Sequence, residues 1–273
     1  MTLSEAFNYG VYFLSSNGVD EAEFKSLCLA CHLAGIKNSD YPLHKNDEII
    51  MKRFADLLWR VKSGEPLQYV IGKWDFYESE FFVGEGVLIP RPETEELTEL
   101  VINKAKTLDK PVVFDLCSGS GCIGISIAKA VPEAVVYCVE KSPEAMFYLL
   151  KNAEGAPNAK VICADVFFPP ELPKANIIVS NPPYIKTKDI ADLQKEVLKE
   201  PHMALDGGAD GLDFYRAICA KWKSYLLPNG SLFFEIGEDQ GNDVSAILAD
   251  SGYNNIEIIR DMYGKDRIVT ANI

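Results

Sequence analysis

The sequence predicts an α/β protein, with a parallel sheet covered on both faces by helices and preceded by a small helical bundle. Two observations predict this fold class. From Pro92 onward, short apolar segments typical of buried strands alternate with helical segments, an order typical of parallel sheets. Before residue 64, apolar residues recur at helical spacing. We therefore expect a helical bundle over residues 1–64, a β-hairpin linker over residues 65–91 and an α/β domain over residues 92–273.

Three amphipathic segments make up the predicted bundle. The first begins at Leu3, and the second follows a capping pair of Asp20 and Glu23. The third begins near Asn46 and ends at Gly64, because glycine commonly ends a helix. The apolar positions that define these helices are Leu3, Phe7, Val11, Leu14, Phe24, Leu27, Cys31, Leu33, Ile49, Ile50, Phe54, Leu57, Leu58 and Val61.

The hairpin and the α/β domain follow in order along the chain. Two β-type runs, Phe76–Tyr77 and Glu80–Val83, predict the hairpin. Pro92 suits the first position of a helix, which we expect to continue to Leu108. The later strands are expected at Val112–Leu116, Val135–Glu140, Val161–Ala164, Ile177–Ser180 and Ser231–Ile236, with two more near the C-terminus. The later helices are expected at Gly121–Ala130, Pro143–Ala153, Asp213–Leu226 and Asp239–Asp250.

Composition and charge exclude several classes of protein. The chain of 273 residues is 48% hydrophobic and 25% charged, which excludes disordered, collagen-like and coiled-coil proteins. It has no apolar run near the roughly 18 residues that a bilayer crossing requires. Its start lacks the basic residues of a secretory signal, so we expect a cytoplasmic protein with no membrane partner. The net charge of −13 opposes sequence-independent binding to nucleic acids.

The seven cysteines are expected to be free thiols, as is usual in a cytoplasmic chain. Cys28, Cys31 and His32 spell the attachment string of a c-type haem. This string lies within a predicted amphipathic helix, and no further Cys/His pair completes a tetrahedral metal site. We therefore expect neither a haem nor a bound metal.

A glycine-rich loop follows the first predicted strand of the α/β domain and opens a helix. Ligands of such folds bind beyond the carboxyl ends of the strands, where free N–H groups of the helix start favour an anionic group. Glu140, at the end of the next strand, can accept hydrogen bonds from ribose hydroxyls. A dinucleotide and S-adenosylmethionine both fit this pattern. The candidate cofactor-binding residues here are Asp115, Cys117, Ser118, Gly119, Ser120, Gly121 and Glu140.

The segment from Asn181 to Tyr184 distinguishes between these two cofactors. It follows an apolar strand and therefore lies at the same edge of the sheet as the glycine loop. Because Pro182 and Pro183 have no N–H, the segment presents carbonyl acceptors without competing donors. The Asn181 side-chain oxygen adds an acceptor, and Tyr184 adds a flat apolar face. Such a site orients a planar –NH₂ group toward an electrophilic methyl group, which favours S-adenosylmethionine and makes Asn181, Pro182 and Tyr184 the candidate catalytic residues.

Further stretches of sequence extend this pattern over residues 64 to 273. They are Gly64–Gly72, Val87–Glu95, Glu200–Pro201, Ala204–Leu205, Gly207–Asp213, Glu235–Gly237 with Gln240, and Asp261–Arg267. Together with the glycine loop and Asn181–Tyr184, they resemble the release-factor glutamine methyltransferases, the HemK/PrmC family. The resemblance implies a class I S-adenosylmethionine-dependent methyltransferase with a Rossmann-like sheet.

The resemblance also implies a reaction and a cofactor site. The reaction is methylation of the side-chain amide nitrogen of the glutamine in the GGQ motif of class 1 peptide release factors. By the family pattern, the loop from Cys117 to Gly121 holds the methionine part of the cofactor and Glu140 holds the ribose. Asp165 and Val166 contact the adenine, and Asn181 lies beside the cofactor. Cys117 stands where the family usually has glycine, and Glu140 where aspartate is common.

Substrate contacts are implied in the same way. Asn181, Pro182, Pro183 and Tyr184 would hold the substrate glutamine, and Arg91 would shape the pocket mouth or contact the release factor. We assign the N-terminal bundle to binding the release factor away from its GGQ loop. No direct contact with nucleic acid is implied, and we expect a monomer.

Three other functions are weighed against this reading. A DNA adenine methyltransferase would suit the same pocket, but it predicts a basic target-recognition region that this acidic chain lacks. A non-catalytic binding protein would not need Gly119, Glu140 and Asn181 together. A nicotinamide-linked dehydrogenase has no use for the proline-rich segment, because hydride transfer involves no amide nitrogen.

Overall fold

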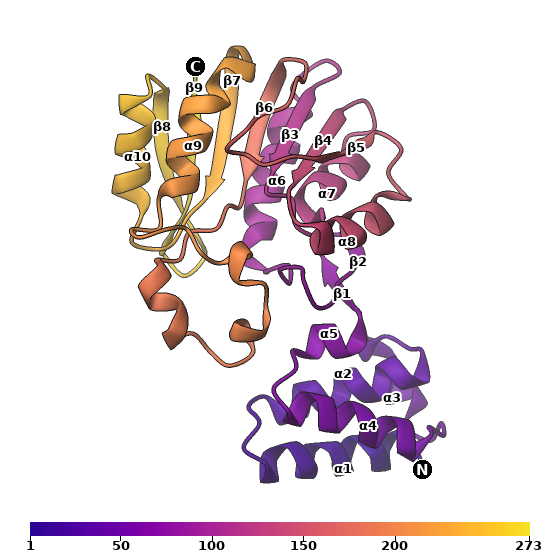
Figure 1. Cartoon of the computed structure of the whole chain (residues 1–273). Coiled ribbons are helices and arrows are strands. Elements are labelled where there is room, and N and C mark those ends of the chain that lie inside the picture. Colours follow the sequence, from indigo (N-terminus) through magenta and orange to yellow (C-terminus); the bar gives the residue numbers. More distant parts are fainter. The chain divides into compact units, whose positions relative to one another are not determined.

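The computed structural model describes residues 1–273, which form two compact units (Figure 1). Unit 1 contains Met1–Lys73 and Gln194–Lys199, and unit 2 contains Trp74–Leu193 and Glu200–Ile273. The chain therefore returns to unit 1 once after unit 2 has begun. None of the helices combines the length and the apolar character that a bilayer crossing requires.

Unit 1 is helical, as the spacing of its apolar residues predicts. Its helices are α1 (Leu3–Ser16), α2 (Ala22–Ala34), α3 (Tyr41–His44), α4 (Met51–Lys62) and α5 (Leu67–Ile71). Helix α1 begins with a capping box in which Thr2 and Glu5 each accept the other's backbone N–H. The predicted pair of Asp20 and Glu23 makes no such box, because Glu21 is the N-cap residue of α2 and has a left-handed backbone with φ 53°.

The helices of unit 1 pack closely and enclose one charged group. Gly10 lets α1 approach α2, since a Cβ atom there would lie 2.2 Å from Ser26 Oγ. Lys25 on α2 is only 5% exposed, and its Nζ pairs with Glu196 Oε1 at 2.6 Å. Cys28 and Cys31 are buried in α2, and all seven cysteines of the chain are free thiols. The returning segment Gln194–Lys199 therefore supplies the partly exposed partner of a buried lysine.

The region predicted as a hairpin linker begins with a helix. Pro66 is the N-cap residue of α5, and Gly72 ends this helix with φ 80°. The hairpin follows as β1 (Lys73–Phe76) and β2 (Ser79–Phe82). The rings of Phe76 and Phe81 meet at 6.0 Å within the core of unit 2. The hairpin thus packs onto unit 2 and is more than a linker.

Unit 2 contains a seven-stranded sheet in the order β5-β4-β3-β6-β7-β9-β8. Its strands are β3 (Val112–Leu116), β4 (Val135–Glu140), β5 (Ala159–Cys163), β6 (Ala175–Ser180), β7 (Leu226–Glu235), β8 (Asn254–Arg260) and β9 (Asp266–Asn272). The first five strands in this order are parallel, but β9 is antiparallel to both of its neighbours. The expected parallel sheet is found in these five strands, and β9 departs from it because the short turn after β8 leaves no room for a crossover helix.

Helices cover both faces of this sheet and form two apolar cores. The helices are α6 (Glu93–Ala105), α7 (Cys122–Ala130), α8 (Pro143–Ala153), α9 (Asp213–Lys221) and α10 (Gly241–Asp250). Helices α6, α7 and α8 pack on the face that carries Val113 and Ile177. Helices α9 and α10 pack on the face that carries Phe114 and Ile178. Adjacent strand residues point to opposite faces, so the middle positions of β3 and β6 are apolar on both faces.

Candidate active site

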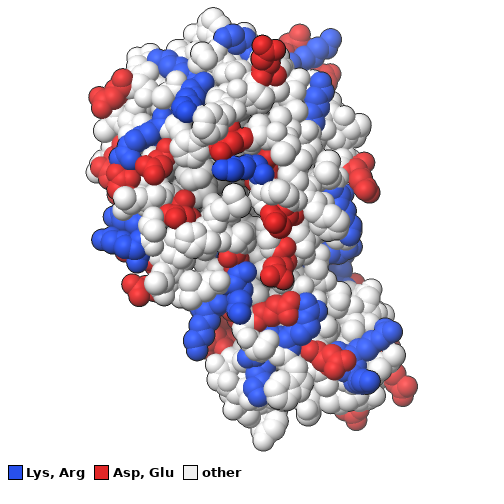
Figure 2. Space-filling model, viewed as in Figure 1, with Lys and Arg blue, Asp and Glu red and all other residues white.

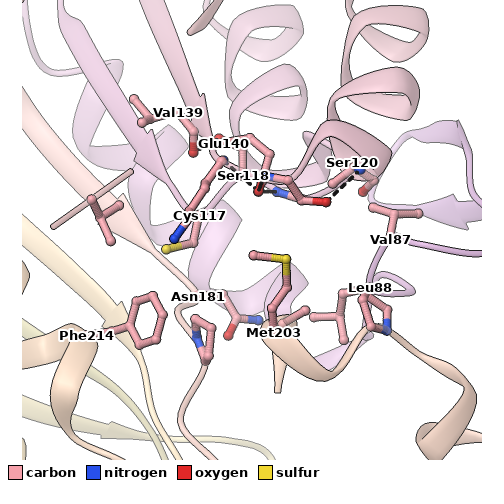
Figure 3. A pocket seen from close by; sticks show the side chains of 18 of the residues that line it. Val87, Leu88, Cys117, Ser118, Ser120, Val139, Glu140, Asn181, Met203 and Phe214 are labelled. Carbon is pink, nitrogen blue, oxygen red and sulfur yellow. Dashed lines mark hydrogen bonds between the residues drawn. The ribbon is translucent and has the colours of Figure 1, made fainter. Parts of the chain in front are cut away.

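A cavity of about 330 Å³ lies at the carboxyl ends of β3, β4 and β6, a size typical of small-molecule sites. Its wall includes Gly86–Arg91, Thr94, Cys117–Ser120, Val139–Ser142, Ala164–Phe167, Asn181, Pro183, Pro201–Ala204 and Phe214. Figure 3 shows Ser118, Ser120 and Glu140 on one side of this space and Asn181 and Met203 on the other. The cavity therefore brings together the glycine loop and the Asn181 segment, as their positions after strands predict.

The two segments meet because the ends of β3 and β6 are tied together. Leu116 pairs in register with Ser180, and Ser180 Oγ donates a hydrogen bond to the Leu116 carbonyl at 2.6 Å. The loop after β3 is closed by a bond of 2.7 Å from Ser118 Oγ to the Asp115 carbonyl. Cys117 has φ 61° within this loop, a conformation that favours glycine and costs about 1 kcal/mol or more in other residues. The tight turn therefore stores strain at the cavity wall.

Glu140 holds the glycine loop in place through its side chain. Its Oε2 accepts the N–H of Gly119 at 2.8 Å, and its Oε1 accepts those of Lys141 and Ser142, each at 2.7 Å. A carboxylate offers about four acceptor positions, so these three bonds leave about one on Oε2 for a ligand hydroxyl. Glu140 therefore supports the loop and also faces the cavity.

Two of the predicted cofactor-binding residues, Asp115 and Gly121, lie behind the cavity wall. Asp115 is fully buried, and its Oδ2 accepts the Gly124 N–H at 2.9 Å, while its Oδ1 has no partner. Burial raises the pKa of Asp115 to about 7. A Cβ atom on Gly121 would lie 2.4 Å from Leu149 Cδ1, so this glycine lets α7 pack against α8. Both residues therefore stabilise the loop from the side that faces away from the cavity.

Asp165 and Val166 line the cavity after β5. Asp165 Oδ2 pairs with Lys141 Nζ at 2.8 Å. Burial raises the pKa of Asp165, but its hydrogen bonds to Lys141 and the Phe167 amide outweigh this effect and lower the pKa overall. The Val166 side chain is buried, and its carbonyl accepts the Trp222 indole N–H at 2.9 Å. Both residues are thus held at the cavity wall by other parts of unit 2.

Within the Asn181–Tyr184 segment, Asn181 and Pro183 line the cavity, but Pro182 and Tyr184 do not. Asn181 Nδ2 donates to Thr94 Oγ1 at 3.2 Å. The Tyr184 carbonyl accepts from Gln240 Nε2 at 3.1 Å, and its ring lies beside Gly237. Burial raises the pKa of the Tyr184 phenol to about 12. The side chain of Tyr184 therefore lies on the β7 side of the segment.

Arg91 lies at the cavity wall and pairs with Glu200. Its Nη2 pairs with Glu200 Oε1, while Glu200 Oε2 accepts the Ile89 N–H at 2.9 Å. The Glu200 side chain is 2% exposed and that of Arg91 33%. The pair ties the stretch before α6 to the stretch that begins at Glu200, and both stretches line the cavity.

Comparison with known proteins identifies the family. A sequence model of the PrmC N-terminal domain matches residues 5–72, and one of the methyltransferase small domain matches residues 91–212. The release factor glutamine methyltransferase of Thermodesulfovibrio yellowstonii is 40% identical over 250 residues, covering 88% of this chain and 89% of the relative. That of Geobacter sulfurreducens is 36% identical over 281 residues, covering 100% and 97%. The chain belongs to the release factor glutamine methyltransferase family.

Solved structures agree on the fold of this family member. A methyltransferase from Pyrococcus furiosus gives a TM-score of 0.52 at 15% identity, covering 82% of this chain and 98% of that chain. A ribosomal protein L11 methylase from Lactobacillus delbrueckii subsp. bulgaricus gives 0.50 at 18% identity, covering 70% and 82%. At these identities the likeness concerns the fold alone. It confirms the predicted Rossmann-like methyltransferase sheet.

The pair of Arg91 and Glu200 leads to a prediction about stability. Arg91→Ala is expected to lower the free energy of unfolding by about 2 to 3 kcal/mol, because it leaves a buried carboxylate unpaired. Glu200→Gln is expected to cost less, since glutamine keeps an oxygen for the Ile89 N–H. Urea unfolding of the two variants and the wild type measures both effects. A larger loss for Glu200→Gln than for Arg91→Ala would contradict this account.

Sequence reasoning missed two polar residues near Asn181. Thr94, in the first turn of α6, lines the cavity and accepts from Asn181. Glu235, the last residue of β7, is 2% exposed and adjoins both Thr94 and Asn181. An acidic residue at the end of an apolar strand was a usable signal for Glu235. Nothing in the local sequence distinguishes Thr94 from any residue of a helix start.

Proposed function

We propose that this chain transfers a methyl group from S-adenosylmethionine to the side-chain amide nitrogen of the glutamine in the GGQ motif of class 1 peptide release factors. The name shared by its relatives supports the class of reaction and substrate. The observation that carries the proposal is the placement of Asn181 in one cavity with Glu140 and the Cys117–Ser120 loop. Asn181, which can accept an N–H from a planar amide, thus lies in the same cavity as the residues suited to bind the cofactor.

The residues of the cavity fit S-adenosylmethionine. The volume of the cavity suits a ligand of this size, and Glu140 keeps an acceptor position for a ribose hydroxyl. The buried hydroxyl of Ser120 has no partner within the protein and lies in the loop that would hold the methionine part. Val166 and Phe214 offer apolar contacts for the adenine. The predicted contacts of Cys117, Ser118, Gly119 and Asp165 belong to the same proposal.

The protein's own part in the reaction is to orient the substrate amide. The bound cofactor supplies an electrophilic methyl group on a sulfonium. Asn181 gives an N–H to Thr94, so its Oδ1 is the atom left to accept an N–H from the substrate. Accepting this hydrogen bond increases the electron density on an otherwise weakly nucleophilic nitrogen and fixes its direction. The nitrogen loses one proton to water once the methyl group has been transferred. Such orientation contributes several kcal/mol in enzyme reactions, by rough analogy with intramolecular reactions.

Incubation with a purified release factor and methyl-labelled cofactor, followed by peptide mass mapping, tests the proposed function. The expected result is one added methyl group on the GGQ glutamine. Label on another residue or no label would contradict the proposal.

Methylation of DNA is disfavoured by the net charge of −13, and Figure 2 shows Lys and Arg interspersed with Asp and Glu on the visible face.

We further propose that unit 1 contributes to binding the release factor through an aromatic surface on α1 and α4. Tyr9 is 39% exposed and Trp59 57%, and both rings contact that of Phe13, with centroids 6.2 Å and 5.7 Å away. Lys62 Nζ lies 4.1 Å from the centre of the Trp59 ring. Exposed aromatic clusters of this kind are typical of protein-binding surfaces.

Replacement of Tyr9 and Trp59 together by alanine tests the role of this surface. KM for the release factor is expected to rise about tenfold, the size of a modest interface loss, with the cofactor Kd unchanged. Steady-state kinetics and calorimetry give the two values, and Leu43→Ala, at an exposed position on α3, is the control. An unchanged KM would remove the aromatic surface from the binding site.

A further inference from the structure

Glu235 is a buried carboxyl group that the proposed reaction does not yet use. It ends β7, where the preceding residue Phe234 pairs in register with Ser180. Glu235 and Asn181 are therefore the next residues along two neighbouring strands. The Glu235 side chain is nine-tenths or more buried, and its Oε2 has no hydrogen-bond partner within the protein. A buried acceptor without a partner calls for a functional explanation.

The neighbours of Glu235 connect it to Asn181. Both Thr94 and Asn181 lie beside its carboxyl group, where they favour its charged form, although neither makes a hydrogen bond to Oε2. The Thr94 hydroxyl oxygen already accepts an N–H from Asn181 at 3.2 Å. Its own proton is therefore free to be donated to a carboxylate, which only accepts when charged. This sequence of donors and acceptors runs from Asn181 through Thr94 to Glu235.

This arrangement decides which way the Asn181 amide points. An asparagine amide has a donor side and an acceptor side of almost the same shape, so its neighbours must select the orientation. A carboxylate can only accept hydrogen bonds, and so can a hydroxyl whose proton is already donated to that carboxylate. Both must therefore face the N–H side of the Asn181 amide. The Oδ1 side then remains for the cavity.

We propose that Glu235 is a positioning residue for methyl transfer: acting through Thr94, it keeps the Asn181 Oδ1 facing the substrate amide. This inference rests on the proposed function, because it assigns Asn181 Oδ1 to the substrate glutamine. Glu235 touches neither substrate nor cofactor. Its effect is on the fraction of bound substrate held in the reactive orientation, and hence on kcat more than on KM.

The protonation of the buried Glu235 makes this orientation depend on pH. Arg267 on β9 faces it with a positive charge and Glu93 on α6 with a negative one, while Tyr184, Tyr215 and Cys122 are uncharged neighbours. Burial raises the pKa of Glu235 to about 7. Below this pH the carboxyl group gains a proton and loses an acceptor for Thr94. The wild type should therefore lose kcat/KM as pH falls through about 7, since this ratio reports groups of the free enzyme.

Glu235→Gln in the full-length chain tests the inference with a release factor as substrate. The expected result is a fall in kcat of about tenfold or more, because small misplacements of reacting groups reduce rates strongly. KM and the cofactor Kd should stay within about twofold, and the pH-dependent loss of kcat/KM near pH 7 should become smaller. Buried Asp115, whose pKa is also about 7, accounts for the part that remains. Glu257→Gln, at an exposed position on β8, is the matched control.

A second pair of variants keeps the test independent of how Glu235→Gln folds. Thr94→Val removes the hydroxyl and should lower kcat to a similar degree, while Thr94→Ser restores the hydroxyl and should recover most of it. Thermal unfolding of each variant checks the fold. Wild-type kcat in Thr94→Val, or an unchanged pH profile in Glu235→Gln, would overturn the inference alone. A wild-type chain that labels no release factor would overturn the proposed function and this inference with it.

Discussion

Asn181→Ala is expected to lower kcat by about 100-fold to 1,000-fold, the range found when a group that stabilises a transition state is removed. Asn181 presents the side-chain acceptor at the cavity wall after β6. Alanine removes this acceptor and leaves the substrate amide free to rotate. The cofactor Kd should change by less than about fivefold, because the Glu140 and Cys117–Ser120 contacts remain.

Steady-state methyl transfer and calorimetric titration of S-adenosylmethionine measure these two effects of Asn181→Ala. Asn103→Ala, on the exposed face of α6, is the matched control and should leave both values unchanged. Asn181→Asp distinguishes charge from shape, because it keeps an acceptor and loses the N–H that Thr94 receives. Wild-type turnover in Asn181→Ala would remove Asn181 from the catalytic residues.

Glu140→Ala is expected to weaken cofactor binding by about 100-fold, the effect of losing one or two hydrogen bonds to a charged group. The substitution removes the acceptor of the Gly119, Lys141 and Ser142 N–H groups as well as the acceptor for a ribose hydroxyl. The loop at Gly119 would then have to be ordered by the ligand itself. This added ordering cost appears as a loss of affinity.

Calorimetry with S-adenosylmethionine measures the loss in Glu140→Ala. Glu140→Asp should recover much of the affinity, since a shorter carboxylate can still accept from the cofactor. Glu144→Ala, at an exposed position in the first turn of α8, controls for the loss of a negative charge nearby. Equal losses in Glu144→Ala and Glu140→Ala would show that charge alone matters and would remove Glu140 from the ribose site.

The elements with a strong apolar pattern could be predicted to the residue. Strands β3 and β4 and helix α8 have the bounds expected from sequence, because each has an apolar run with clear turn residues beside it. Residues 65–91 are expected to form a hairpin linker, yet Leu67–Ile71 within them forms α5 between Pro66 and Gly72. The helix expected to reach Leu226 ends at Lys221, and Leu226 begins β7. In both places tertiary packing overrides local preference.

Site residues could be predicted where they follow directly after strands. They could not be predicted where contacts between neighbouring elements decide which way a side chain points. Glu140 and Asn181 each end or follow a strand, and both line the cavity. Asp115 lies one residue before the end of β3, but its side chain turns toward α7 and accepts the Gly124 N–H. The direction of a side chain at a strand end depends on the neighbouring elements. The link from Thr94 to Glu235 joins residues far apart in sequence, which no local pattern shows.

The returning segment Gln194–Lys199 limits how this protein can be divided. A fragment that ends at residue 73 keeps every helix of unit 1 and loses Glu196, the partner of the nearly buried Lys25. Lys25 would then lose the carboxylate that pairs with it in the full chain. The helical region is continuous in sequence but is completed only by residues added more than a hundred positions later. During synthesis on the ribosome, it can therefore reach its final stability only after most of the methyltransferase sheet has been made.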